Sequence, residues 1–102
     1  MTLAELKAQV EPGELPPTPI AEATLARYVT GLPAPSLSLL SDGTIYAQWR
    51  REDRICILLV FGDGKARVYR AQVVDGRPED EATVNNLRPR DMAHWVHWVL
   101  AE

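Results

Sequence analysis

Three side chains that could bind a metal or transfer a proton recur at every third position near the end of the chain: Asp91, His94 and His97. In a helix, side chains three residues apart can converge on one metal ion. Over six residues, however, the series rotates by about 120° around the helix axis. It also lies opposite the apolar side chains of the same segment. We therefore interpret the three residues as a solvated polar face, and keep a metal-dependent or acid–base enzyme as an alternative.

Other routes to catalysis lack their usual residues. Cys56 is the single cysteine and lies inside the apolar run 55–61, which is typical of a buried thiol that acts as a small hydrophobe. The chain has only two histidines, both expected on one helix surface, and the sequence indicates no Ser-His-Asp arrangement around them. The chain has no glycine-rich nucleotide motif and no His-Glu-x-x-His pattern. We predict a protein that is not an enzyme and needs no cofactor or metal.

Trp98 is the most unusual side chain of the last segment. It lies roughly 130° from the centre of the apolar stripe that includes Met92, Trp95 and Val99. A tryptophan in that position either covers a sheet edge within the monomer or contacts a partner, since tryptophan and arginine often anchor protein interfaces.

A second unusual feature is the arginine cluster Arg50, Arg51 and Arg54, which Glu52 and Asp53 interrupt. Local pairing on an exposed turn is one interpretation, and docking to an acidic partner is the other.

The composition fits one folded domain over residues 1–102, with 46% apolar and 25% charged residues. The net charge is −3 and the pI about 5.3, which argues against direct nucleic-acid binding. Residues 1–48 hold five acidic and two basic side chains, so the acidic surplus lies there. No stretch approaches the ~18 apolar residues of a membrane span, and the first residues do not have the pattern of a signal peptide. We expect a cytoplasmic protein that does not enter a membrane.

The elements expected around these residues are helices and strands in separate runs. Helices are predicted from Leu3 to about Val10, from Pro19 to Thr30 and from Pro89 to about Ala101, with residues 11–19 a proline-rich lead-in. Strands are predicted over 36–41, 44–49, 54–61 and 66–74, and residues 82–84 are either a fifth strand or a loop. The predicted fold is α+β, in the order α-α-β-β-β-β-(β)-α: an antiparallel meander of four or five strands with helices packed mainly on one face.

Asp-Gly turns suggest how these strands pair. Suppose that Asp42-Gly43 and Asp63-Gly64 are two-residue type I′ turns and that Arg51-Glu52 is the centre of the turn between them. The opposing pairs then include Leu40 with Ile45, Ala47 with Cys56, and Leu58 with Tyr69. The face predicted to seat the helices then carries Leu40, Ile45, Ala47, Trp49, Cys56, Leu58, Val60, Tyr69, Ala71 and Val73. The other face carries Leu37, Leu39, Tyr46, Gln48, Ile55, Ile57, Leu59, Phe61, Val68, Arg70 and Gln72. A one-residue slip would exchange the faces, but in either case both faces are too apolar to be left in water.

Residues 16–70 resemble small uncharacterised bacterial and phage proteins. The shared pattern is a short helix, a Leu-Pro-x-Pro segment (LPAP), an Asp-Gly turn, a strand that ends in tryptophan, an apolar strand and a second acid-Gly turn. The resemblance implies a mobile-element setting and a small α+β fold, and it transfers no catalytic residue.

These features favour a small protein-binding protein, in the form of an inhibitor of a host protein such as an anti-CRISPR or antitoxin. A homodimeric structural or regulatory protein is the alternative. The predicted interaction residues are Trp98, Tyr46, Arg50, Arg51, Arg54 and Arg70.

Overall fold

The computed structural model describes residues 3–101 and confirms the predicted α+β fold. Five antiparallel strands form one sheet in the order β1-β2-β3-β4-β5, so each strand pairs with its neighbour in sequence. The elements are α1 (Leu3–Ala8), α2 (Pro19–Val29), β1 (Ser36–Leu39), β2 (Ile45–Arg51), β3 (Arg54–Val60), β4 (Ala66–Val74), β5 (Arg77–Asn85), the 3₁₀ turn η1 (Pro89–Asp91) and α3 (Met92–Leu100).

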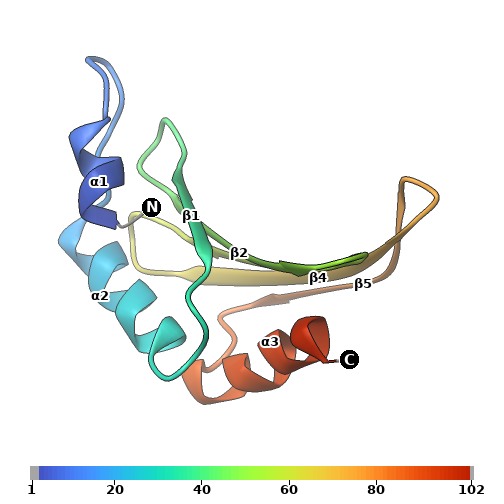
Figure 1. The fold of residues 1–102 in the computed structure, drawn as a ribbon. Coiled ribbons are helices and arrows are strands. Elements are labelled where there is room, and N and C mark those ends of the chain that lie inside the picture. The colour runs from blue at the N-terminus through green and yellow to red at the C-terminus, as the bar shows by residue number, and fades with distance from the viewer. Residues whose placement is uncertain (1–2, 102) are drawn as a thin grey trace.

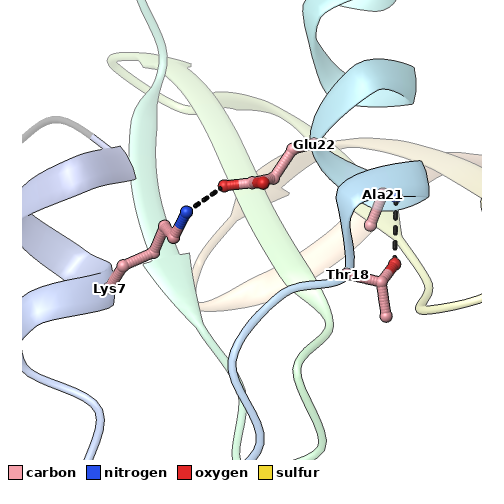
Figure 2. A network of polar contacts seen from close by, with 4 residues as sticks. All are labelled: Lys7, Thr18, Ala21 and Glu22. Atoms are coloured by element: carbon pink, nitrogen blue, oxygen red, sulfur yellow. Dashed lines mark hydrogen bonds and ion pairs between the residues drawn. The ribbon is translucent and has the colours of Figure 1, made fainter.

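Helix α2 begins where the sequence predicts. The Thr18 hydroxyl caps it by accepting a hydrogen bond from the Ala21 N–H at 3.1 Å, and Pro19 occupies the first turn, where its missing N–H costs nothing. Figure 2 shows this cap beside the ion pair of Lys7 and Glu22, which joins α1 to α2 at 2.8 Å. The ion pair joins the two N-terminal helices to each other, and the Thr18 hydroxyl also donates to the Gly62 carbonyl at 2.7 Å, which connects the start of α2 to the β3–β4 loop.

Helices α2 and α3 lie on the same side of the sheet, and within residues 3–101 no helix lies over the other side (Figure 1). The burial of the β3 side chains differs accordingly between the two faces of the sheet. Cys56, Leu58 and Val60 have no exposed surface, whereas the residues that alternate with them are half-buried. The core beneath the helices consists of Ala21, Leu25, Tyr28, Ile45, Ala47, Trp49, Cys56, Leu58, Val60, Ala66, Val68, Met92, Val96 and Val99. None of the described helices is long and apolar enough to span a membrane.

The first and third hairpin turns differ from the prediction. Leu39 pairs with Ile45 and Val60 with Ala66, and in each loop only the glycine, Gly43 or Gly64, has a positive φ, +87° in both. The aspartate of each loop instead accepts a hydrogen bond from the backbone N–H two residues on, Thr44 to Asp42 at 2.9 Å and Lys65 to Asp63 at 3.0 Å. An aspartate that folds its own turn in this way gives a three-residue loop with a left-handed glycine.

These longer loops move β1 and β4 by one residue, so the predicted faces of both strands are wrong. Leu37 and Leu39 oppose Ala47 and Ile45, which places them on the helix-covered face. On β4, Val68 and Arg70 oppose Leu58 and Cys56 and lie on that face as well, whereas Tyr69 lies on the other. The β2–β3 pairing shifts by two residues and therefore keeps its predicted faces.

The fifth strand is longer than predicted, at nine residues. It follows β4 directly through Asp75-Gly76, where both residues have positive φ, as a two-residue type I′ turn requires. The segment therefore continues the meander rather than ending it. Strand β5 forms one edge of the sheet, and Pro78 together with an irregular register near Asp80 interrupts its pairing.

Candidate functional site

Asp91, His94 and His97, the residues of the metal or acid–base alternative, are all exposed. Asp91 lies in the turn η1, and His94 and His97 are exposed on α3. Within residues 3–101, no group of three histidine, cysteine or acidic side chains could hold a metal ion. These residues have the solvated positions that their spacing predicts.

Cys56 lies in the core and not in a cleft. It has no exposed surface, and burial raises the pKa of its thiol to about 12, against a small opposing effect of the Arg70 charge. Because the thiolate is the nucleophilic form, this thiol is unreactive at neutral pH.

Two of the predicted interaction arginines bind the end of α3. Arg54 Nη1 donates to the Trp98 carbonyl at 2.8 Å, and Arg51 Nη1 donates to the Leu100 carbonyl at 2.9 Å. The last carbonyls of a helix lack partners inside it and carry the negative end of its dipole. Both arginines therefore fasten the end of α3 to the β2–β3 hairpin.

Trp98 lies at the centre of a cluster of aromatic and cationic side chains. The Arg70 guanidinium carbon lies 4.9 Å from the Trp98 ring centroid and 4.9 Å from that of Trp95, and the Arg54 carbon lies 5.2 Å from Trp98. Both indoles are half-buried and pack against the core. Trp98 thus packs within the chain against Arg70 of β4 and Arg54 of β3, which are inner strands, and not over a sheet edge as we had considered.

Arg70 belongs to this cluster but lies on the opposite face of β4 from the one that the sequence predicts. It was predicted on the uncovered face with Tyr46, but the shift of β4 turns it toward α3. Its Nε is buried and has no hydrogen-bond partner within the described part of the chain. Stacking between two indoles is then the main interaction of this cation.

A cleft of about 310 Å³ lies beside Arg54, between the β2–β3 turn and the end of α3. Four of its polar side chains make contacts within the protein: Asp53 accepts from Gln72 at 2.8 Å, and Arg51 and Arg54 bind α3 as described above. A second cleft, of about 120 Å³, separates α1 from β1 and is lined by apolar side chains together with Gln9 and Glu14.

The uncovered face of the sheet is the remaining candidate, and we call it the open face. Its three central strands carry half-buried Ile55, Ile57, Leu59, Tyr46 and Tyr69, none of which packs against the core beneath the helices. This surface is apolar and aromatic, and it is continuous across β2, β3 and β4. Contiguous apolar surface of this kind usually marks an interaction site.

Polar and charged side chains border the open face. The Tyr69 hydroxyl donates to Glu81 Oε1 at 2.7 Å, and this hydrogen bond to a carboxylate raises the pKa of Tyr69. Arg67 Nε donates to Asn85 Oδ1 at 2.8 Å, and the Arg67 guanidinium lies 5.7 Å from the Phe61 ring centroid. Arg50, opposite Ile55, is exposed at the far end of the face.

The six predicted interaction residues therefore divide between two faces. Arg51, Arg54, Arg70 and Trp98 lie on the helix side, where they contact one another or α3, while Tyr46 and Arg50 lie on the open face. Sequence reasoning missed Arg67 and Tyr69 as neighbours of Tyr46. The alternation along β4 could have found them if the loop length before that strand had been known.

The fold and this surface define a class: a small α+β protein with a five-stranded antiparallel meander whose helices, over residues 3–101, lie on one face (Figure 1). Comparison with protein-family models, with curated proteins and with solved structures gave no match.

Proposed function

We propose that this protein is a small non-enzymatic protein-binding protein whose binding surface is the open face. The observation that carries the proposal is the alternation of β3. On its helix side Cys56, Leu58 and Val60 have no exposed surface. On its other side Ile55, Ile57 and Leu59 are equally apolar but only half-buried, and no described helix lies over them (Figure 1). A central strand with apolar residues on both sides is typical of sheets that are covered on both faces.

The composition of the open face supports a protein partner over a small molecule. Its centre is isoleucine and leucine, and its border holds tyrosine and arginine, the residue types that most often anchor protein interfaces. The nearby cleft beside Arg54 opens on the helix side and does not extend this surface. The narrower form of the proposal, an inhibitor of a host protein carried by a mobile element, rests on the resemblance of residues 16–70 alone.

Photo-crosslinking from the centre of the open face tests the proposal. A photoreactive amino acid replaces Ile57 in the chain expressed in its own host, and a matched variant carries it at Ile20, which is 61% exposed on α2. We expect position 57 to give a discrete crosslinked protein band and position 20 to give none. The absence of a discrete product from position 57, in a chain that remains folded, would overturn the proposed function.

A further inference from the structure

We propose that the occupant of the open face is a second copy of this chain, packed sheet against sheet about a two-fold axis. The inference rests on the proposed function and specifies its partner. It is carried by the order in which side chains are arranged on the open face, which makes that face complementary to itself.

The strand register places the open-face residues in three rows across β2, β3 and β4. The central row is Gln48, Ile57 and Tyr69. One flanking row is Arg50, Ile55 and Ala71, and the other is Tyr46, Leu59 and Arg67. Ile57 thus lies at the centre of a grid whose two arginines occupy opposite corners. Ala71 is only 1% exposed, so its corner of the grid is already covered within the chain.

Two sheets that pack face to face in the aligned manner keep their strands within about 30° of each other. A two-fold axis parallel to β3 then places β2 of one copy over β4 of the other. Within each row, Arg67 faces Tyr46 of the second copy and Arg50 faces Ala71. A two-fold axis that is perpendicular to β3 and parallel to the sheet places each outer row over the opposite outer row of the second copy. Arg50 then faces Tyr46, and Arg67 faces Ala71.

Neither arrangement brings the two arginines together. In both, an arginine lies over the face of a tyrosine, where a cation is attracted by the ring. Isoleucine and leucine meet across the centre, as in the core of an isologous interface. The open face is therefore complementary in charge and in chemistry to a second copy of itself.

The distribution of acid agrees with this arrangement. The carboxylates of Glu5, Glu11, Glu14 and Glu22 belong to α1, α2 and the segment between them, which pack beside β1 and on the helix side of the sheet. Packing through the open face keeps these acidic segments on the outside of the pair. Repulsion between two chains of net charge −3 is then weakened by distance and by salt.

Association through the sheet edges is less favourable. Strand β5 has Pro78 and the irregularity near Asp80 along its length, and β1 has four residues and lies beside α1. Features of this kind block the extension of a sheet by another strand. The face, rather than an edge, is the surface that a second copy can cover.

Sedimentation over a range of concentrations tests the inference. We expect the wild-type protein to approach twice the 11.4 kDa mass of the chain as its concentration rises. Ile57→Asp should weaken the association by at least about 30-fold, as for a residue at the centre of an interface. The matched substitution Ile20→Asp, on exposed α2 surface, should leave the association unchanged. Circular dichroism melting verifies that both variants fold.

A substitution at Tyr46 provides a second readout, because this residue faces an arginine of the second copy in either arrangement. Tyr46→Arg places like charges together, whereas Tyr46→Glu places opposite charges together. We therefore expect the dissociation constant of the Tyr46→Arg dimer to be at least about 10-fold higher than that of the Tyr46→Glu dimer.

A wild-type protein that stays at the monomer mass up to about 1 mM would overturn the inference, as would a pair that Ile57→Asp leaves intact. If position 57 then crosslinks to a different protein, the open face still binds protein, and only the second copy is excluded. If it crosslinks to nothing, the proposed function fails with the inference.

Discussion

Arg70 and Trp98, separated by 28 positions in the sequence, stack with 4.9 Å between the guanidinium carbon and the ring centroid. This contact connects β4 to α3. It explains how a tryptophan far from the apolar stripe of its helix is accommodated within one chain. Trp95 lies at the same distance from Arg70, so one cation is shared by two indoles.

The first prediction concerns these two tryptophans. Their spacing alone predicts a large loss of stability for Trp95→Ala, of ~3–5 kcal/mol, and about 1 kcal/mol or less for Trp98→Ala. Because both rings are half-buried and stack on Arg70, the structure predicts similar losses, of about 2–3 kcal/mol each. Urea denaturation measures both, with the exposed His94→Ala on the same helix as a control that should stay within about 0.5 kcal/mol. A difference above about 2 kcal/mol between the tryptophan variants would contradict the shared stack.

The second prediction concerns the end of α3. Arg54→Gln removes the charged donor to the Trp98 carbonyl, and we expect a loss of about 1–2 kcal/mol. Hydrogen exchange should quicken in the last turn of α3 more than in β3. Arg50→Gln provides the matched control, because Arg50 lies on the open face of the neighbouring strand and does not contact α3 in any described hydrogen bond. Equal effects of the two substitutions would show that Arg54 does not cap the helix.

The third prediction concerns two glycines with similar backbone angles, Gly43 at φ +87° and Gly76 at φ +76°. A Cβ at Gly43 would lie 2.7 Å from the Pro16 carbonyl oxygen, whereas a Cβ at Gly76 would meet nothing within 4 Å. Gly76→Ala should therefore cost about 1 kcal/mol of backbone strain, and Gly43→Ala should cost at least about 1 kcal/mol more. Thermal melting compares the two variants. Equal melting temperatures would show that the backbone at Pro16 moves away from the added methyl group at little cost.

The same dipeptide explains which parts of the fold the sequence could predict. Asp-Gly occurs at three hairpins, and its presence identifies a turn in each case. The aspartate of the turn has two possible conformations. Asp75 adopts a positive φ, whereas Asp42 and Asp63 accept a hydrogen bond from the residue two positions on. The choice between them depends on the strands that the turn must join. Element order was therefore predictable, whereas the faces of β1 and β4 were not.

The candidate sites, like the fold, could be predicted from the sequence only in part. Apolar residues on both sides of β3 predict, without knowledge of the register, that both faces of the sheet need cover, whereas the described helices lie over one face only (Figure 1). The partners of Trp98 could not be predicted, because Arg70 had been assigned to the wrong side of β4. The binding of Arg51 and Arg54 to α3 joins segments more than 40 residues apart, which local patterns do not report.

The last prediction concerns pH and Cys56. Burial raises the pKa of the folded thiol to about 12, above its ordinary value of 9.0. A raised pKa in the folded state means that stability is fully present below about pH 9 and is lost as pH rises from there toward 12, because only the unfolded chain releases its proton in that range. Wild type should therefore lose more stability than Cys56→Ala between these pH values, although the variant is less stable at pH 7 for lack of the buried sulfur. Denaturation of both proteins at several pH values measures the difference, and an alkylating reagent at pH 8 should modify Cys56 only after unfolding. Parallel pH profiles, or modification of the folded protein, would show that the thiol reaches solvent in the native state.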